Sequence, residues 1–508
     1  MPLAVIHSLA FLGVDAISID VEVDVKSSDK FSLIIVGLPD AAVKESKDRV
    51  LTAIGNSGFK LNTCHCTVNL APGDLKKEGP LYDLPIALGI LCCNGVISNS
   101  TYEDYLYAGE LGLSGQMRPM RGALSAALLA RKLGKKGVLL PAANAREAAS
   151  VPNISVIGIE GLKDALQFLQ DPSSIAPSVY HHRSDSAVCT SSLDFANIKG
   201  QLHAKRALEI AASGGHNVLF FGPPGSGKTI LAKAMCGILP SLSIEESLEV
   251  TKIHSIAGLL SEENSLVLQR PFRSPHHTIS PAGLIGGGSI PRPGEISLAH
   301  KGVLFLDELP EFPRSALEVL RQPLENKSIT ISRAFGTVAF PTDCIFIAAM
   351  NPCPCGLLGH PKKPCRDTPT QIQKYRNKIS GPILDRIDMH IEVPSISFAD
   401  MSFPSHSESS ASVQKRVIAA RSVQYARQGG STINALLSSE DIATFCHLDH
   451  PCSLLMREAM DKMGISARAY HRILKVARTI ADLEQKVQIH KEHLMEAISF
   501  RSWERPIG

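Results

Sequence analysis

Residues 222–229 read Gly-Pro-Pro-Gly-Ser-Gly-Lys-Thr, a combination that could hold the phosphates of a nucleotide. The run before them, 217–221, is apolar, and the residues after them have helical spacing. A glycine-rich loop between a strand and a helix lets backbone N–H groups surround phosphate oxygens, while its lysine reaches the β and γ oxygens and its threonine ligates Mg²⁺. We therefore predict a nucleoside triphosphate site formed by Gly222, Pro223, Pro224, Gly225, Ser226, Gly227, Lys228 and Thr229.

Polar side chains follow two further apolar runs. Asp307 and Glu308 come directly after the run 302–306, and we expect Asp307 to hold Mg²⁺ and Glu308 to orient and deprotonate the attacking water. Asn351 follows another apolar run and could touch the γ-phosphate or position that water, although an asparagine before proline also forms turns. Together with the phosphate loop, these residues predict hydrolysis.

Two arginines are candidates for stabilising the transferred phosphoryl group. Arg386 suits a finger inserted into the nucleotide of a neighbouring subunit, although arginines more often pair locally, here with Asp385 or Asp388. Arg468 opens a helical pattern and could close onto the γ-phosphate, but Arg472 lies one turn away on the same face.

The bulk composition sets limits on the kind of protein. A chain of 508 residues is too long for one core, so about two to four domains are expected. The net charge of +3 permits a nucleic-acid partner without implying one. The N-terminus lacks the pattern of a signal peptide, and the longest apolar stretch, 84–97, is too short to span a bilayer. We expect a cytoplasmic protein with no membrane partner.

Two Ser-rich stretches, 171–194 and 395–412, are typical of linkers. Strands and helices alternate between them, which predicts a parallel sheet covered on both faces. The last part has helical spacing at 453–463, 466–484 and 491–502. The predicted regions are an N-terminal domain 1–170, an ATPase core 195–394 with an insert at about 252–293, a hairpin 327–342 and a Cys-rich loop 353–367, and a helical domain 413–508.

Three of the twelve cysteines have the spacing of a metal site. Cys353, Cys355 and Cys365 could converge on a structural Zn²⁺, with Asp367 or His360 as the fourth ligand. The alternative is a loop of reduced thiols stabilised by its Pro and Gly turns.

The order of these motifs resembles the magnesium-chelatase-like group of AAA+ ATPases. The segments that carry the resemblance are 199–229, 270–288, 294–312 and 379–394. The resemblance implies a P-loop AAA+ core with a C-terminal helical lid, ATP and Mg²⁺ as cofactors, and homo-hexamers with ATP sites between subunits. For one branch of the group it implies a helicase-like DNA motor that drives branch migration during natural transformation, with recombination proteins as possible partners. The rival is an ATPase subunit that remodels a partner protein, as magnesium chelatase subunits do.

A DNA motor needs basic side chains near its substrate. The predicted insert contributes Arg273, and the predicted hairpin contributes Lys327 and Arg333. The resemblance points to the hairpin as the element that meets DNA, whereas a basic residue on a turn is by itself usually only solvated.

The N-terminal part resembles the proteolytic domain of the Lon family (S5-type, α+β) through the segments 67–72, 77–81 and 109–119. The resemblance places its serine position at Leu81 and its lysine position near Leu124, and neither leucine can act as nucleophile or base. We expect a protease-inactive scaffold, with Ser114 as the remaining candidate for a nucleophile.

Overall fold

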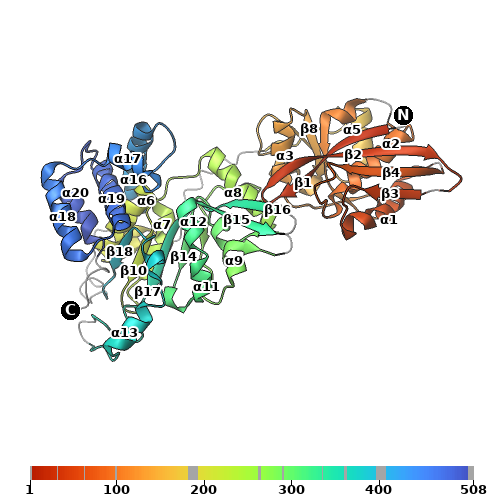
Figure 1. Ribbon diagram of the computed structural model, residues 1–508. Coiled ribbons are helices and arrows are strands. Elements are labelled where there is room, and N and C mark those ends of the chain that lie inside the picture. The colour runs from red at the N-terminus through yellow and green to blue at the C-terminus, as the bar shows by residue number, and fades with distance from the viewer. Residues whose placement is uncertain are drawn as a thin grey trace. The chain divides into compact units, whose positions relative to one another are not determined.

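The computed structural model describes residues 3–30, 32–61, 63–97, 100–180, 193–260, 265–288, 291–333, 336–359, 363–395 and 408–501. The chain divides into two compact units, which are described separately (Figure 1). Unit 1 comprises 1–186, 244–267 and 332–338, and unit 2 comprises the rest. The predicted linkers fall largely on 181–192 and 396–407, which lie outside the described residues. No described helix is long and apolar enough to cross a membrane.

Unit 1 contains two larger sheets covered by helices, and a short antiparallel pair, β6–β7. The first sheet has the order β1-β2-β4-β3, antiparallel except for the β3–β4 pair, and the second has the parallel order β5-β8-β9. Its strands are β1 (Leu3–Leu12), β2 (Asp15–Ser27), β3 (Ser32–Val36), β4 (Cys64–Ala71), β5 (Tyr105–Tyr107), β6 (Glu110–Leu111), β7 (Met117–Arg118), β8 (Gly137–Pro141) and β9 (Ser155–Ile159). Its helices are α1 (Ala41–Asn56), α2 (Asp83–Cys93), α3 (Ala123–Lys132), α4 (Ala142–Ala148), α5 (Leu162–Gln170) and α8 (Ile244–Ala257).

Helix α8 belongs to unit 1 although it follows the phosphate-loop helix in sequence. The Ser255 hydroxyl accepts a hydrogen bond from Gly122 N at 2.9 Å and donates to the buried carboxylate of Glu147. Burial raises the pKa of Glu147, while the hydrogen bonds from Ser255 and Leu124 N oppose the shift. This buried cluster fixes α8 within unit 1.

Unit 2 is built on a five-stranded parallel sheet with the order β11-β14-β17-β10-β18. Its strands are β10 (Val218–Phe221), β11 (Phe272–Arg273), β12 (Gly286–Gly287), β13 (Arg292–Pro293), β14 (Val303–Leu306), β17 (Ile345–Met350) and β18 (Met389–Glu392). The paired strands β15 (Ser328–Arg333) and β16 (Gly336–Pro341) are divided between the units, because 332–338 belong to unit 1. Its shorter helices are α9 (Pro281–Ile285), α10 (Glu295–Leu298), α11 (Arg314–Glu318), α12 (Arg321–Asn326), α13 (Pro369–Arg376) and α14 (Gly381–Leu384).

The central strands are apolar throughout because the side chains of each strand pack into two hydrophobic cores, one on either face of the sheet. In β10, Val218 and Phe220 join one core while Leu219 and Phe221 join the other, and β14 and β17 divide their side chains in the same way. A strand buried on both faces needs an unbroken apolar run, which is the pattern that the sequence shows.

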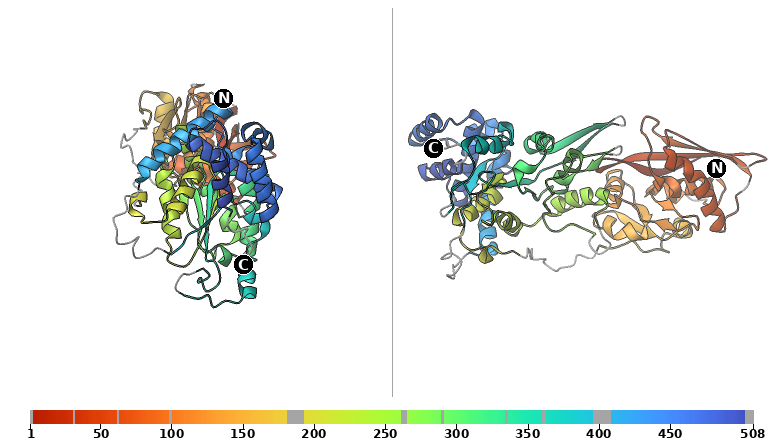
Figure 2. Two further views of the ribbon diagram at one scale, coloured as in Figure 1. Left: turned by 90° about the vertical axis from the view of Figure 1, so that its left-hand side faces the viewer. Right: turned by 90° about the horizontal axis from the view of Figure 1, so that it is seen from below.

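Helices from the end of the chain cover one of these cores. They are α16 (Ser410–Gln428), α17 (Ser439–Phe445), α18 (His450–Met463), α19 (Ala467–Leu483) and α20 (Lys491–Ser499). Two of them, α16 and α19, pack against α6 (Leu202–Gly214), and α16 also packs against α7 (Lys228–Ile238). Two further views show these C-terminal helices, in blue, gathered beside the yellow helices (Figure 2). The predicted α/β fold with a parallel sheet and a C-terminal helical lid is confirmed.

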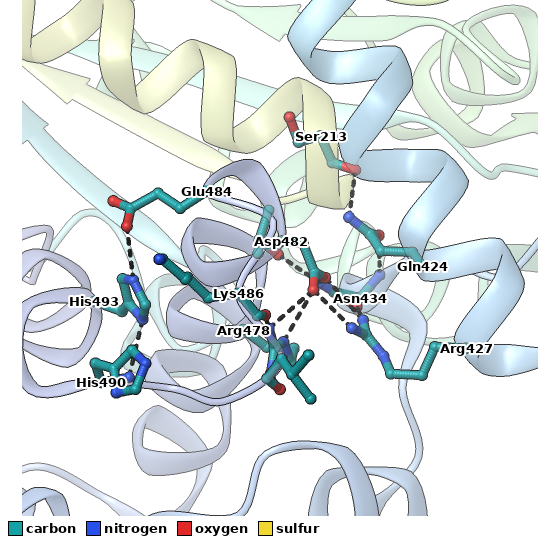
Figure 3. Close-up of polar contacts among 12 residues, drawn as sticks. Ser213, Gln424, Arg427, Asn434, Arg478, Asp482, Glu484, Lys486, His490 and His493 are labelled. Atoms are coloured by element: carbon teal, nitrogen blue, oxygen red, sulfur yellow. Dashed lines mark hydrogen bonds and ion pairs between the residues drawn. The ribbon is translucent and has the colours of Figure 1, made fainter.

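Buried polar contacts hold the lid helices to one another. Asp482 accepts hydrogen bonds from Arg427 at 2.6 and 2.8 Å and from Arg478 at 3.1 Å, and Asn434 Nδ2 donates to it at 2.8 Å (Figure 3). Because the Asp482 carboxylate is fully buried, two arginines beside it satisfy a charge that would otherwise be costly.

Candidate nucleotide-binding site

Three adjacent parallel strands bring the predicted chemistry to one edge of the sheet. The phosphate loop follows β10, Asp307 follows β14, and Asn351 follows β17, which lies between them. Ligands of open parallel sheets bind at this carboxyl edge. The structure therefore brings the loop, the Mg²⁺ candidates and Asn351 together.

The loop has the backbone that phosphate binding requires. Gly225 and Gly227 have φ angles of 74° and 92°, which lie in the left-handed region that favours glycine. Helix α7 begins at Lys228, so its first N–H groups face the loop. The buried Ser226 hydroxyl has no partner among the described residues. These unsatisfied donors fit the oxygens of a phosphate group.

The side chain of Lys228 is buried against the phosphate loop. Its Nζ donates to the carbonyl oxygens of Gly222 at 2.7 Å and Pro223 at 2.9 Å, and it lies 3.5 Å from Oδ1 of Asn351. Burial lowers the pKa of Lys228, and the charge of Asp307 opposes that shift. A phosphate would give this ammonium group the counter-charge that the two carbonyls supply only in part.

Thr229 and Asp307 meet directly. The Thr229 hydroxyl donates to Oδ2 of Asp307 at 2.7 Å. A hydroxyl and a carboxylate are the oxygen ligands that Mg²⁺ prefers, and a bound ion there would neutralise phosphate charge. The pair therefore fits the predicted Mg²⁺ site.

Glu308 extends from the same strand end into solvent. Its φ of 53° is left-handed, a conformation that costs a non-glycine residue about 1 kcal/mol or more and often marks functional positions. Its carboxylate is 60% exposed, so water can reach it. His277 lies beside it, with Nδ1 3.6 Å from Oε2 of Glu308. The sequence did not reveal this contact, because a histidine in an irregular loop has no pattern that names its partner.

A second residue that the sequence did not single out supports the phosphate loop. Gln201 Nε2 donates to the backbone carbonyl of Ser226 at 3.2 Å and to that of Pro394 at 2.7 Å. Gln201 also has a left-handed φ of 54°. Its position inside the segment 199–229, which carries the family resemblance, was the signal that could have identified it.

Arg386 lies away from the loop of its own chain. It precedes β18, and Met389 of β18 pairs with Val218 at the start of β10, whereas the loop follows the end of β10. Its guanidinium donates to the carbonyls of Arg321 at 3.1 Å and Pro382 at 2.8 Å and to the Glu325 carboxylate. Its ion-pair partner is therefore Glu325 rather than Asp385 or Asp388.

The two arginines of α19 have different surroundings. Arg468 is exposed at the start of the helix. Arg472 is half-buried, and its Nη1 donates to Oδ1 of Asp388 at 2.5 Å. Arg472 is therefore occupied, and Arg468 is the one whose charge faces solvent.

The Cys-rich loop forms a compact cluster. The Sγ atom of Cys353 lies 3.5 Å from that of Cys355 and 3.6 Å from that of Cys365, and the last two are 3.6 Å apart. Oδ2 of Asp367 lies 3.8 Å from the Cys365 Sγ. A tetrahedral Zn²⁺ with bonds of about 2.3 Å would hold sulfur ligands about 3.8 Å apart, so the four residues fit this ion. The rival ligand His360 lies outside the described residues.

This loop touches the nucleotide loop. Gly356, with a φ of 73°, lies so close to the ring of Pro224 that a β-carbon there would come within 2.7 Å of it. The same β-carbon would lie 3.9 Å from the side-chain carbon of Asn351. The Cys-rich loop thus lies beside two parts of the candidate ATP site at Gly356.

Two of the residues predicted to contact DNA form ion pairs with carboxylates of the same chain. Arg273 makes two hydrogen bonds of 2.7 Å to the carboxylate of Glu295, and Lys327 lies 3.7 Å from Oδ1 of Asp343. A DNA phosphate would have to compete with these carboxylates. The side chain of Arg333 and the turn 334–335 lie outside the described part of the structure.

Leucine side chains stand at both the serine and the lysine positions that the Lon resemblance indicates. Leu124 is fully buried, and Leu81 is partly buried against the core of unit 1. Ser114 is exposed in the turn between β6 and β7, and no lysine hydrogen-bonds to it among the described residues. Neither leucine offers a nucleophile or a base.

The fold and site define a P-loop ATPase with a C-terminal helical lid. Three family models match parts of the chain: the magnesium chelatase, subunit ChlI, at 194–401, the subunit ChlI of Mg-chelatase at 21–144, and the magnesium chelatase, subunit ChlI C-terminal, at 407–501. Competence protein ComM of Haemophilus influenzae is 43% identical over 99% of this chain and 98% of its own length. An uncharacterized protein YifB of Escherichia coli is 42% identical over the same shares. A Lon protease of Roseiflexus castenholzii is 25% identical over 30% of this chain and 19% of its own length.

The chain belongs to the ComM/YifB group of magnesium-chelatase-like AAA+ proteins. This family membership, together with the geometry around Lys228 and Asp307, identifies a nucleotide- and Mg²⁺-using ATPase.

Proposed function

We propose that this protein is an ATP-driven DNA motor that assembles as a hexamer. It would act in the cytoplasm on single-stranded or branched recombination intermediates during natural transformation, together with recombination proteins. The identity of 43% to a protein named Competence protein ComM, over nearly the full length of both chains, supports this proposal.

The observation that carries the proposal is the separation of Arg386 from its own phosphate loop. Arg386 lies at the amino edge of the sheet, whereas Lys228, Asp307 and Asn351 lie at the carboxyl edge. An arginine that stabilises transition-state charge can be supplied by another subunit. Arg386 would then complete the site of a neighbour, which makes hydrolysis depend on the ring, while Arg468 would close onto the γ-phosphate from the lid.

The Cys-rich loop would hold a structural Zn²⁺. Cys353, Cys355, Cys365 and Asp367 supply four ligands with tetrahedral spacing and leave no open position for catalysis. The ion would stabilise a loop that otherwise has little regular structure before α13.

A second candidate function is remodelling of a partner protein. It is favoured by the match of all three family models to magnesium chelatase subunit ChlI. The D-x-S-x-S motif of metal-adhesion domains is absent from the sequence, so a partner would have to supply it.

A paired assay separates the two candidates. ATP hydrolysis is measured with no DNA, single-stranded DNA and forked DNA, and branch migration is followed on a labelled four-way junction, with Glu308→Gln as the inactive control. The motor proposal predicts DNA-stimulated hydrolysis and ATP-dependent junction movement. A rate of ATP hydrolysis that DNA does not change, together with no movement of the junction, would favour protein remodelling.

A further inference from the structure

Asp388 is a buried carboxylate directly beside the segment that carries Arg386. It is 5% exposed. Its Oδ1 accepts a hydrogen bond from Arg472 Nη1 at 2.5 Å, and its Oδ2 accepts one from Asn217 N at 2.8 Å. Asp388 thus joins the lid helix α19 to the residue that leads into β10.

The same two residues, Asn217 and Arg472, also hold the backbone of Arg386. The Arg386 carbonyl accepts from Asn217 Nδ2 at 3.1 Å and from Arg472 Nη1 at 3.3 Å. Arg501, just after α20, donates from Nη1 to the carbonyls of Ile387 at 2.8 Å and Asp388 at 3.3 Å. Two arginines from the lid region therefore fix the backbone on which the Arg386 side chain is mounted.

The charge of Asp388 makes this attachment strong. Burial alone would raise its pKa, but the charge of Arg472 and the hydrogen bond from Asn217 N hold the pKa of Asp388 well below its usual range. The carboxylate is therefore ionised at neutral pH, and the pair with Arg472 is a charged pair in a site that water hardly reaches.

A second polar path runs from Asp388 into the lid. His216 Nδ1 lies 3.8 Å from Oδ2 of Asp388, and its Nε2 lies 2.7 Å from the Thr479 hydroxyl. Asn434 Nδ2 contacts that hydroxyl at 3.0 Å and also reaches Asp482, at the centre of the lid cluster (Figure 3). The Arg386 segment is thus connected to the lid at several points.

We propose that Asp388 is a positioning residue that ties Arg386 to the lid through Arg472. Arg468 lies one turn before Arg472 on α19, so the two arginines that would act on nucleotide are carried by one connected body. A lid movement that follows ATP binding or hydrolysis would then shift Arg386. This inference rests on the proposed action of Arg386 at the nucleotide of a neighbouring subunit.

The chain offers a matched control. Arg206 of α6 makes hydrogen bonds of 2.9 and 3.3 Å to Glu496 of α20, and so also joins the core to the lid. None of its described contacts reaches the Arg386 segment. Arg206→Met therefore removes a lid-to-core ion pair without touching the proposed connection.

The test compares Arg472→Met, Arg472→Lys, Asp388→Asn and Arg206→Met with Arg386→Ala. For each full-length protein, kcat for ATP is measured with the dissociation constant of a fluorescent ATP analogue and the thermal midpoint. We expect Arg472→Met to lower kcat about 10²-fold, the size of effect that a 1 Å misplacement of a catalytic group can have, with ATP affinity unchanged. Arg472→Lys should recover part of kcat, and Arg206→Met should retain it.

The double variant Arg386→Ala/Arg472→Met gives the decisive readout. If Arg472 acts through Arg386, the double variant will hydrolyse ATP no more slowly than Arg386→Ala alone, whereas independent structural damage would add. Additive losses, or full kcat in a folded Arg472→Met protein, would overturn the inference while leaving the role of Arg386 standing. A wild-type kcat in Arg386→Ala would overturn the proposed role of Arg386 in hydrolysis, and the inference about Asp388 would fall with it. If Arg472→Met does not fold, Asp388→Asn replaces it in the same cycle.

Discussion

The hydroxyl of Thr229 lies 2.7 Å from Oδ2 of Asp307, although 78 residues separate them in the sequence. The contact joins the first turn of α7 to the end of β14. It brings the phosphate loop and the acidic strand end together in one site, in which Lys228 lies at the start of α7 and Glu308 follows Asp307 at the strand end.

Lys228→Ala and Glu308→Gln should therefore fail in different ways. Without the Lys228 ammonium, phosphate charge is not neutralised, and nucleotide binding should weaken at least tenfold. Glu308→Gln removes only the base and should bind ATP with normal affinity while hydrolysing it about 10²–10⁴-fold more slowly. Fluorescence titration with an ATP analogue and phosphate release measure the two effects. Normal turnover by Glu308→Gln would exclude Glu308 as the base.

His277→Ala should raise DNA-independent hydrolysis severalfold and reduce its stimulation by DNA. The reason is that His277 Nδ1, 3.6 Å from Glu308 Oε2, competes with water for that carboxylate. His276→Ala is the matched control, because the His276 ring lies beside that of His277, with ring centres 4.1 Å apart, and hydrogen-bonds to Thr278. Equal rates in both variants and the wild type would show that the contact has no role in hydrolysis.

Zinc analysis of purified protein tests the cysteine cluster. We expect about one Zn²⁺ per chain in the wild type, with strong loss in Cys353→Ser, because the remaining groups cannot complete a tetrahedral site. Cys236→Ser, which changes a cysteine outside the cluster, should keep the metal. Equal zinc in wild type and Cys353→Ser would remove the proposal.

Asp388 should give stability a defined pH dependence. Its folded-state pKa is depressed, so its contribution is complete above the unfolded pKa of about 3.9 and is lost as pH falls toward the folded value. The difference in thermal midpoint between wild type and Asp388→Asn should be constant from about pH 8 to pH 5 and should shrink below about pH 3.9. Glu496→Gln, which breaks the more exposed pair with Arg206, is the comparison. A difference in thermal midpoint that grows as the pH falls would contradict the conclusion that the folded-state pKa of Asp388 is depressed.

Arg49→Met should destabilise unit 1 by about 3–5 kcal/mol, because it leaves a buried charge without its partner. Arg49 reaches the fully buried carboxylate of Asp83 at 2.9 and 3.1 Å. Burial raises the pKa of Asp83, and the hydrogen bond from Arg49 opposes the shift. Urea unfolding measures the loss, and Arg118→Met, which breaks a more exposed pair with Glu110, should cost less than about 1 kcal/mol. Similar losses in the two variants would contradict the argument.

Local patterns predicted the elements of the ATP site well. The apolar runs before Gly222, Asp307 and Asn351 are β10, β14 and β17, and parallel pairing then places their ends together. The predicted helices 453–463, 466–484 and 491–502 correspond to α18, α19 and α20 within a few residues. In each case the hydrophobic pattern of one segment is enough to predict the strand or helix that the segment forms.

The features that the sequence did not predict depend on distant packing. The partner of Glu308 is His277, and the partner of Arg386 is Glu325, because loops and short helices meet in ways that no spacing encodes. Helix α8 begins at Ile244 and belongs to unit 1, although the predicted insert began at about 252. Its attachment depends on Glu147, more than a hundred residues earlier in the chain.

The contact between Gly356 and Pro224 limits how this enzyme can be altered. Any side chain at position 356 would press on the ring of Pro224 in the phosphate loop, and the φ of 73° would in addition strain its backbone. A protein engineer who grafts a different Cys-rich loop onto this ATPase, or a different phosphate loop beneath it, would have to exchange the two segments as a matched pair.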